Sequence, residues 1–127
     1  MPSVVMLDSS VLIDHFRSAD KTKTFYTSTI DRYDIQYISA VPKLEILYGS
    51  KSELHDYWNN VFETMIVVPF NDSVVEYASR VVLELKRKRA LIDMEDIMIA
   101  ATALAHNLPL ATLNRKHFER IDGLKLV

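Results

Sequence analysis

The chain has 127 residues, of which 49% are hydrophobic and 25% charged, and this composition is typical of one ordinary soluble globular domain. Fifteen basic residues stand against seventeen acidic ones, and a net charge of −2 excludes a bulk electrostatic attraction to nucleic acid or anionic membranes. Two glycines and no cysteine exclude glycine-rich phosphate loops, disulfides and thiolate zinc sites.

Membrane segments are not expected. The longest nearly apolar run, residues 97–105, is far shorter than the ~20 residues that a membrane-spanning helix needs. The N-terminal residues lack both the basic region and the cleavage site of a signal peptide. We therefore expect a cytoplasmic protein.

Short β-rich runs alternate with helical stretches along the whole chain. The runs that predict strands are residues 4–7, 35–38, 65–68, 110–112 and, at an edge of the sheet, 124–127. Alternation of strands and helices indicates parallel crossover units. The expected fold is therefore α/β, with three layers and a four- to five-stranded parallel sheet flanked by helices.

Helical periodicity fills the intervals between these strands. The predicted helices are residues 11–16, 40–48, 52–61, 74–85 and 94–106. Ser39 and Asp93 are candidate N-caps, and Ser73 with Glu76 has the spacing of a capping box. Gly49 is expected just past the end of its helix.

Three carboxylates occupy unusual positions for a domain of this kind. Asp8 directly follows an apolar strand, Glu45 borders the apolar stripe of its helix, and Asp96 opens the most apolar helix. Each also has a simpler explanation: Asp8 as a helix cap, Glu45 as a side chain bent to solvent, and Asp96 as compensation of the helix dipole. Together they predict three acids at one end of a parallel sheet, where Mg²⁺ or Mn²⁺ would relieve their repulsion.

With these residues the sequence resembles a PIN domain, specifically a VapC-type toxin of a type II toxin–antitoxin pair. The resemblance covers residues 1–127 as a single domain and rests on four segments in order: VVMLDSSVLI, KLEILYG, DIMIAATA and TLNRKHF. The family is known for Mg²⁺- or Mn²⁺-dependent ribonucleases, usually dimeric and silenced by a co-encoded antitoxin. The resemblance thus implies an RNA substrate, a cognate antitoxin and a homodimer.

The resemblance also implies roles for individual residues. Asp8, Glu45 and Asp96 correspond to the catalytic, metal-binding acids. The residues expected to support the site are Ser10, Asp93, Thr112, Asn114 and His117. Many members carry an Asp where this chain has His117, which leaves a second metal site open. Asp93 either caps its helix or supplies that missing charge, and His117 could contact a phosphate group.

Basic and aromatic residues indicate where partners bind. The basic residues expected to contact RNA are Arg115, Lys116 and Arg120. The run 86–89 is also basic, but a position at a helix C-terminus explains much of it. Trp58 and Phe62 belong to an aromatic stripe that predicts core packing and, in addition, contact with the antitoxin.

The expected function is hydrolysis of RNA phosphodiester bonds by a metal-activated water. The alternative is a catalytically degenerate PIN-like module that binds RNA or protein. A haloacid-dehalogenase-like phosphatase needs a second Asp where Ser10 stands, and a receiver domain needs an Asp at a later strand end, where Pro69 and Phe70 follow the strand.

Overall fold

Strand β1 (Val4–Leu7) lies at the centre of a parallel sheet in the computed structural model, which describes residues 1–127. It pairs with β2 (Ile35–Ser39) on one side and with β4 (Leu110–Ala111) on the other, and β3 (Ile66–Val68) extends the sheet beyond β2. The order is β3-β2-β1-β4. The apolar run of β1 is explained by this position, because a central parallel strand is covered on both faces.

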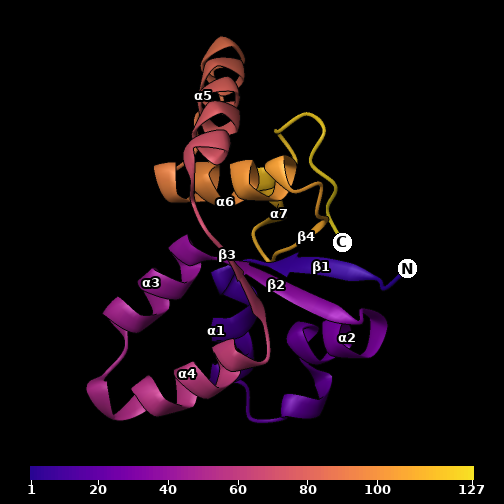
Figure 1. Cartoon of the computed structure of the whole chain (residues 1–127), viewed down its shortest axis with the longest axis vertical. Helices are drawn as coiled ribbons and strands as arrows, with labels where there is room; N and C mark the ends of the chain where they lie inside the picture. Colours follow the sequence, from indigo (N-terminus) through magenta and orange to yellow (C-terminus); the bar gives the residue numbers. More distant parts are fainter.

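Helices cover both faces of the sheet and complete the predicted three layers (Figure 1). The helices of one layer are α1 (Ser9–Arg17), α2 (Phe25–Arg32), α3 (Ala40–Gly49) and α4 (His55–Glu63), with the short helices η1 (Lys21–Lys23) and η2 (Ser52–Leu54). The helices of the other layer are α5 (Asp72–Arg87), α6 (Met94–Ala105) and α7 (Arg115–Phe118). None of these helices combines the length and the apolar character needed to cross a bilayer.

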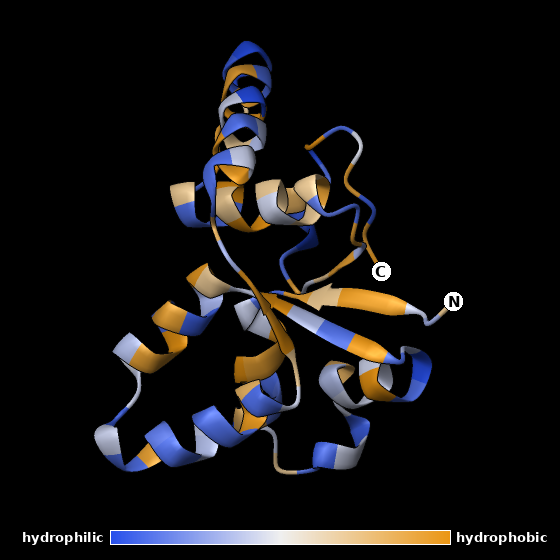
Figure 2. Ribbon diagram, in the orientation of Figure 1, coloured by the Kyte–Doolittle hydropathy of each residue, from blue (hydrophilic) through white to orange (hydrophobic).

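Two hydrophobic cores lie on opposite faces of the sheet. Met6 packs into the core formed with α5, α6 and α7, whereas Val5 and Leu7 pack into the core formed with α1 to α4. This alternation follows from the two-residue period of a strand. Figure 2 shows β1 as one of the most hydrophobic segments, while hydrophilic and hydrophobic residues alternate along the helices.

The chain reverses its direction across the sheet beside β1. The first two crossovers run from β1 to β2 and from β2 to β3, and the third returns past β1 to β4. Ligands of open parallel sheets bind at such a switch point, beyond the carboxyl ends of the strands. Asp8 follows β1 and Thr112 follows β4 at this point, and the Asp8 N–H donates to the Ala111 carbonyl oxygen at 3.0 Å.

Four of the five predicted strands are confirmed, and the fifth is wrong as a strand. Residues 124–127 form a single parallel bridge, between Leu126 and Leu110. The Leu110 N–H donates to Lys125 O at 2.8 Å, and Val127 N–H donates to Leu110 O at 3.0 Å. The segment therefore covers the outer edge of β4 without extending the sheet.

Helix α2 is absent from the sequence-based prediction. The helix has only eight residues, and its apolar residues are Phe25, Tyr26 and Ile30, too few to give a strong helical pattern in the sequence. The local start signal is Thr24, whose side chain accepts a hydrogen bond from Thr27 N–H. The helix packs against α1 and β2, so tertiary contacts rather than periodicity establish it.

Helix α3 begins as predicted but ends differently. The Ser39 hydroxyl accepts a hydrogen bond from Val41 N–H at 3.2 Å, which satisfies one free donor of the first turn. Gly49 is the last helical residue and Ser50 is the C-cap, so the prediction that Gly49 lies just past the end of the helix is wrong.

Helix α5 begins earlier than predicted. Its N-cap is Asn71, whose side-chain oxygen accepts from Val74 N–H at 3.3 Å, and Ser73 Oγ donates to the same oxygen at 2.9 Å. The predicted capping box of Ser73 and Glu76 is therefore wrong, because Ser73 already lies inside the helix.

A pair of leucines on α5 tests the packing of the two layers. Leu85 is fully buried in the core, whereas Leu83 is 55% exposed. We expect Leu85→Ala to lower the free energy of unfolding by about 2–5 kcal/mol, since it leaves a cavity. Leu83→Ala should stay within about 0.5 kcal/mol of the wild type. Urea titrations of both variants check this, and equal midpoints would contradict the packing described here.

Candidate functional site

Asp8 is held by two hydroxyl groups at the carboxyl ends of β1 and β4. The residue is 1% exposed, and its Oδ2 accepts hydrogen bonds from Ser10 Oγ and from Thr112 Oγ1, each at 2.8 Å. Each hydroxyl also accepts a backbone N–H, Leu113 to Ser10 at 3.1 Å and Asn114 to Thr112 at 2.9 Å. Both hydroxyl protons are thereby directed at Oδ2, and Oδ1 keeps only one long contact, of 3.4 Å, to the next residue.

Capping does not explain the Asp8 side chain. Asp8 occupies the N-cap position of α1, but its carboxylate makes no hydrogen bond to the first turn of that helix. Asp93 occupies the N-cap position of α6, also without a side-chain cap. The capping explanations offered by the sequence are therefore wrong for both side chains. Asn114, in contrast, contributes its backbone N–H to the Asp8 network.

Four carboxylates interact at the switch point. Helix α3 carries Glu45, and α6, which contacts α3, carries Glu95 and Asp96 in its first turn. Burial raises the pKa of Glu95 most, and the value reaches about 7. Donation of the Glu95 proton to the Glu45 carboxylate raises it further, as do the charges of Glu45, Asp96 and Asp8. Burial and the charge of Asp8 likewise raise the pKa of Asp96. All three acids singled out by the sequence therefore lie close enough to Glu95 to raise its pKa.

Glu95 is the residue that sequence reasoning missed. In the sequence it is a second acid in the first turn of α6, and compensation of the helix dipole is a sufficient explanation. In the structure it is partly buried and lies beside Glu45 on another helix, which helps to raise its pKa. The available signal was three acids within four residues at the start of an apolar helix, which exceeds what a dipole requires.

His117 contacts Asp96 directly. The Nδ1 of His117 lies 2.8 Å from Oδ2 of Asp96, and this hydrogen bond opposes the upward shift of the Asp96 pKa. The contact joins α7 to the first turn of α6. One oxygen of Asp96 is thus engaged by an imidazole, in the same way that one oxygen of Asp8 is engaged by hydroxyls.

The donor set suits a hard divalent cation, although no preformed centre is present. No group of three or more His, Asp or Glu side chains is arranged to hold a metal ion. The available donors are carboxylate oxygens, and burial together with neighbouring negative charges raises the pKa of Glu95 and of Asp96. Mg²⁺ and Mn²⁺ prefer oxygen ligands and keep bound waters, so they fit an open site of this composition.

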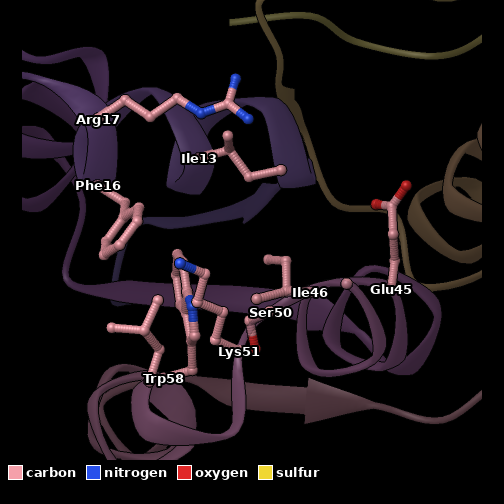
Figure 3. A pocket seen from close by; sticks show the side chains of 10 residues that line it. Ile13, Phe16, Arg17, Glu45, Ile46, Ser50, Lys51 and Trp58 are labelled. Carbon is pink, nitrogen blue, oxygen red and sulfur yellow. The ribbon is translucent and has the colours of Figure 1, made fainter.

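A groove of about 490 Å³ leads to these acids. It lies between α1, α3 and α4, and Figure 3 shows Glu45 at one end and Trp58 toward the other. Arg17 and Lys51 supply positive charge to its lining. Trp58 lines the groove but is only 3% exposed, and Phe62, also 3% exposed, packs behind it at a ring separation of 6.1 Å.

The basic residues near the site differ in their contacts. Arg115, Lys116 and Arg120 are exposed on or just after α7, the helix that also carries His117. Lys88, in the basic run, has a structural role, because its Nζ forms ion pairs with Glu84 at 3.1 Å and with Asp122 at 3.0 Å. The guanidinium groups of Arg115 and Arg120 each donate one hydrogen bond to a backbone carbonyl oxygen, of Val127 and Ala90 respectively, and make no ion pair.

Comparisons with known proteins agree with this architecture. The PIN domain family model matches residues 5–124. Ribonuclease VapC1 of Methanocaldococcus jannaschii is 31% identical over 98% of this chain and 87% of its own length. Ribonuclease VapC1 of Rickettsia felis is 29% identical over 97% and 94%.

Solved structures share the fold over nearly all of their length. VapBC2 from Rickettsia felis, bound to a DNA fragment from its promoter, matches with a TM-score of 0.84 and 24% identity, over 98% of this chain and 97% of that one. VapBC-1 from nontypeable Haemophilus influenzae matches with a TM-score of 0.86 and 23% identity, over 98% and 96%.

The fold and the site define a small α/β protein whose carboxylates converge at the switch point of a parallel sheet. The chain belongs to the PIN domain family and, within it, to the VapC-type ribonucleases.

Replacement of Glu95 tests whether carboxylate repulsion limits the stability of the metal-free protein. Folding raises the Glu95 pKa from 4.5 to about 7, so its contribution is present below 4.5 and is lost as the pH rises through about 7. In EDTA, we expect the wild-type Tm to fall between about pH 5 and about pH 8 more steeply than that of Glu95→Gln.

The exposed Glu63 provides a matched control for this measurement. Glu63→Gln should keep the wild-type dependence of Tm on pH. If Tm depends on pH in the same way in Glu95→Gln and in the wild type, repulsion at Glu95 does not destabilise the folded protein.

Proposed function

We propose that this chain is the toxin of a toxin–antitoxin pair, a cytoplasmic endoribonuclease that uses Mg²⁺ or Mn²⁺ to hydrolyse RNA phosphodiester bonds. The observation that carries the proposal is the cluster of Asp8, Glu45, Glu95 and Asp96 at the switch point of the sheet. Relatives that are similar over nearly the full chain are ribonucleases of the VapC type. A group of carboxylates can bind a divalent cation, and a nuclease needs such a cation next to the phosphate that is cleaved.

Asp8, Glu45 and Asp96 are the proposed metal-binding acids. When bound, the cation supplies an activated water and neutralises charge on the scissile phosphate. Ser10 and Thr112 fix Oδ2 of Asp8 and leave Oδ1 as its free ligand atom. Glu95 adds negative charge beside Glu45 and thereby increases the electrostatic gain from a divalent cation.

RNA is proposed to approach over α7. Arg115, Lys116 and Arg120 are exposed there, and His117 links the same helix to Asp96. Cations in these positions hold the phosphates on either side of the bond to be cleaved, while base contacts define the sequence. A net charge of −2 is compatible with this role, because without the three proposed metal-binding acids the chain has 14 acidic and 15 basic residues.

Cleavage of RNA by wild type and Asp96→Asn tests the proposal. With Mg²⁺ or Mn²⁺, the wild type should cleave RNA, and Asp96→Asn should lose roughly 100-fold or more of that activity because a charged ligand oxygen is lost. EDTA should abolish the wild-type activity. A Mn²⁺-dependent rise in Tm should accompany cleavage and shrink in Asp96→Asn.

Two outcomes would contradict this function. Equal cleavage by both proteins that survives EDTA would remove the metal mechanism. RNA binding without cleavage and without a Mn²⁺-dependent rise in Tm would favour the alternative, a catalytically degenerate PIN-like binding module. The exposed Asp72→Asn, far along the chain from the acids, serves as the charge-matched control.

The cognate antitoxin is proposed to lie in the groove between α1, α3 and α4. Its apolar floor accepts hydrophobic side chains, and the positive charges of Arg17 and Lys51 favour acidic residues of the partner. At the other end, Glu45 favours a basic side chain, which would occupy the place of the metal. Trp58 contributes to the floor, and Phe62 supports it from behind.

Charge reversal at the edge of the groove tests antitoxin binding without disturbing the core. Trp58 is too buried for a clean test, because its truncation leaves a cavity. We expect Arg17→Glu with Lys51→Glu to weaken binding of the co-encoded antitoxin at least tenfold in calorimetry. Lys86→Glu with Arg87→Glu, on α5, is the control that should bind normally, and equal affinities would place the antitoxin elsewhere.

A homodimer is the proposed state of the free toxin. Leu44 and Tyr48 are 68% and 90% exposed and lie one turn apart on α3, so they form one apolar strip. Large apolar side chains at this exposure are typical of a surface that packs against a second copy.

A further inference from the structure

A second hollow, of about 380 Å³, lies beside His117 and is separate from the groove. Its lining is formed by the segment that precedes α6 and by the end of α7: Leu91, Ile92, Asp93, His117 and Arg120. Because His117 also contacts Asp96, this hollow adjoins the carboxylate cluster directly.

Two opposite charges face this hollow without neutralising each other. Asp93 makes no side-chain hydrogen bond at the start of α6 and no ion pair. Arg120 makes no ion pair either, and its one side-chain hydrogen bond runs from Nη1 to Ala90 O at 3.3 Å. A cation and an anion that stay apart in one hollow are complementary to a ligand carrying both an anionic group and hydrogen-bond donors.

The hollow is braced, so its charges keep their separation. Lys88 Nζ donates to the carbonyl oxygen of Arg120 and to Asp122 Oδ1, each at 3.0 Å. The Arg120 hydrogen bond to Ala90 ties the same turn to the segment that precedes α6. Both walls are therefore joined through α5, and a binding site built on them is preorganised.

We propose that this hollow binds a guanine nucleotide of the RNA, next to the bond that is cleaved. The inference rests on the proposed ribonuclease function and assigns the base class that the substrate carries at this position. Asp93 is the specificity-determining residue, and Arg120 holds the phosphate of the same nucleotide.

The chemistry of the base edge favours guanine. An ionised carboxylate is an acceptor with two oxygens, and guanine presents two adjacent donors, its ring N1–H and its exocyclic amino group. Uracil presents one donor between two carbonyl oxygens, and these would face the Asp93 carboxylate unfavourably. Leu91, which is 54% exposed, and Ile92 provide apolar surface for the face of the base.

Binding of mononucleotides tests this assignment independently of cleavage. The probes are guanosine 5′-monophosphate and uridine 5′-monophosphate, titrated into the full chain while methyl resonances of Leu91 and Ile92 are followed by NMR. We expect these resonances to respond to the guanine nucleotide with roughly tenfold tighter binding than to the uracil nucleotide, the discrimination of one bidentate pair. Asp93→Asn should remove the preference, and Arg120→Gln should weaken both nucleotides.

The exposed Glu119→Gln is the matched control and should bind both probes as the wild type does. Equal affinity for the two nucleotides, an unchanged preference in Asp93→Asn, or responses confined to the groove at Trp58 would each overturn the proposal. If neither nucleotide shifts the resonances of Leu91 and Ile92, the proposal is also overturned, and a protein partner becomes the better candidate for this surface. Selective guanine binding in a chain that fails to cleave RNA would support the nucleotide site while removing the ribonuclease function.

Discussion

Carboxylates that are brought together and partly withdrawn from water repel one another, and this repulsion is the constraint on which the candidate site depends. The pKa of Glu95 reaches about 7 because the residue is partly buried and three other acids lie near it, and the pKa of Asp96 is shifted in the same direction. A fold keeps such a cluster only if rigid contacts hold each member. Here two hydroxyls hold Asp8, an imidazole holds Asp96, and the packing of α3 against α6 holds Glu45 beside Glu95.

The topology of the sheet explains why these contacts can exist. The reversal of strand order beside β1 brings the ends of β1 and β4 together, although they lie about a hundred residues apart in the chain. The Ser10 and Thr112 hydroxyls therefore reach the same carboxylate oxygen. Two surface depressions adjoin the acids: the groove at Glu45 has a largely apolar lining, and the hollow at His117 is lined by both acidic and basic residues.

Sequence reasoning finds the parts of this protein that depend on local pattern. The apolar runs predict the four strands, and the position of Asp8 after a buried run predicts its place at the sheet edge. The sequence does not single out Glu95, because an acid in the first turn of a helix is already explained by the helix dipole. The contact of His117 with Asp96 depends on where α7 packs, and no spacing in the chain encodes that distance. The start of α5 was misplaced because Ser73 and Asn71 are both good caps, and only the backbone decides between them.

The shortness of β4 has a consequence for how the protein loses its competence on heating. This strand contributes two residues to the sheet and is held at its outer edge by the hydrogen bonds of residues 125 and 127. Opening of that edge frees Thr112 and with it one of the two supports of Asp8, while the three other strands and both cores stay intact. Edge segments of this kind open at a lower free energy than the whole domain. We therefore expect the support of Asp8 by Thr112 to be lost on heating before the whole domain unfolds.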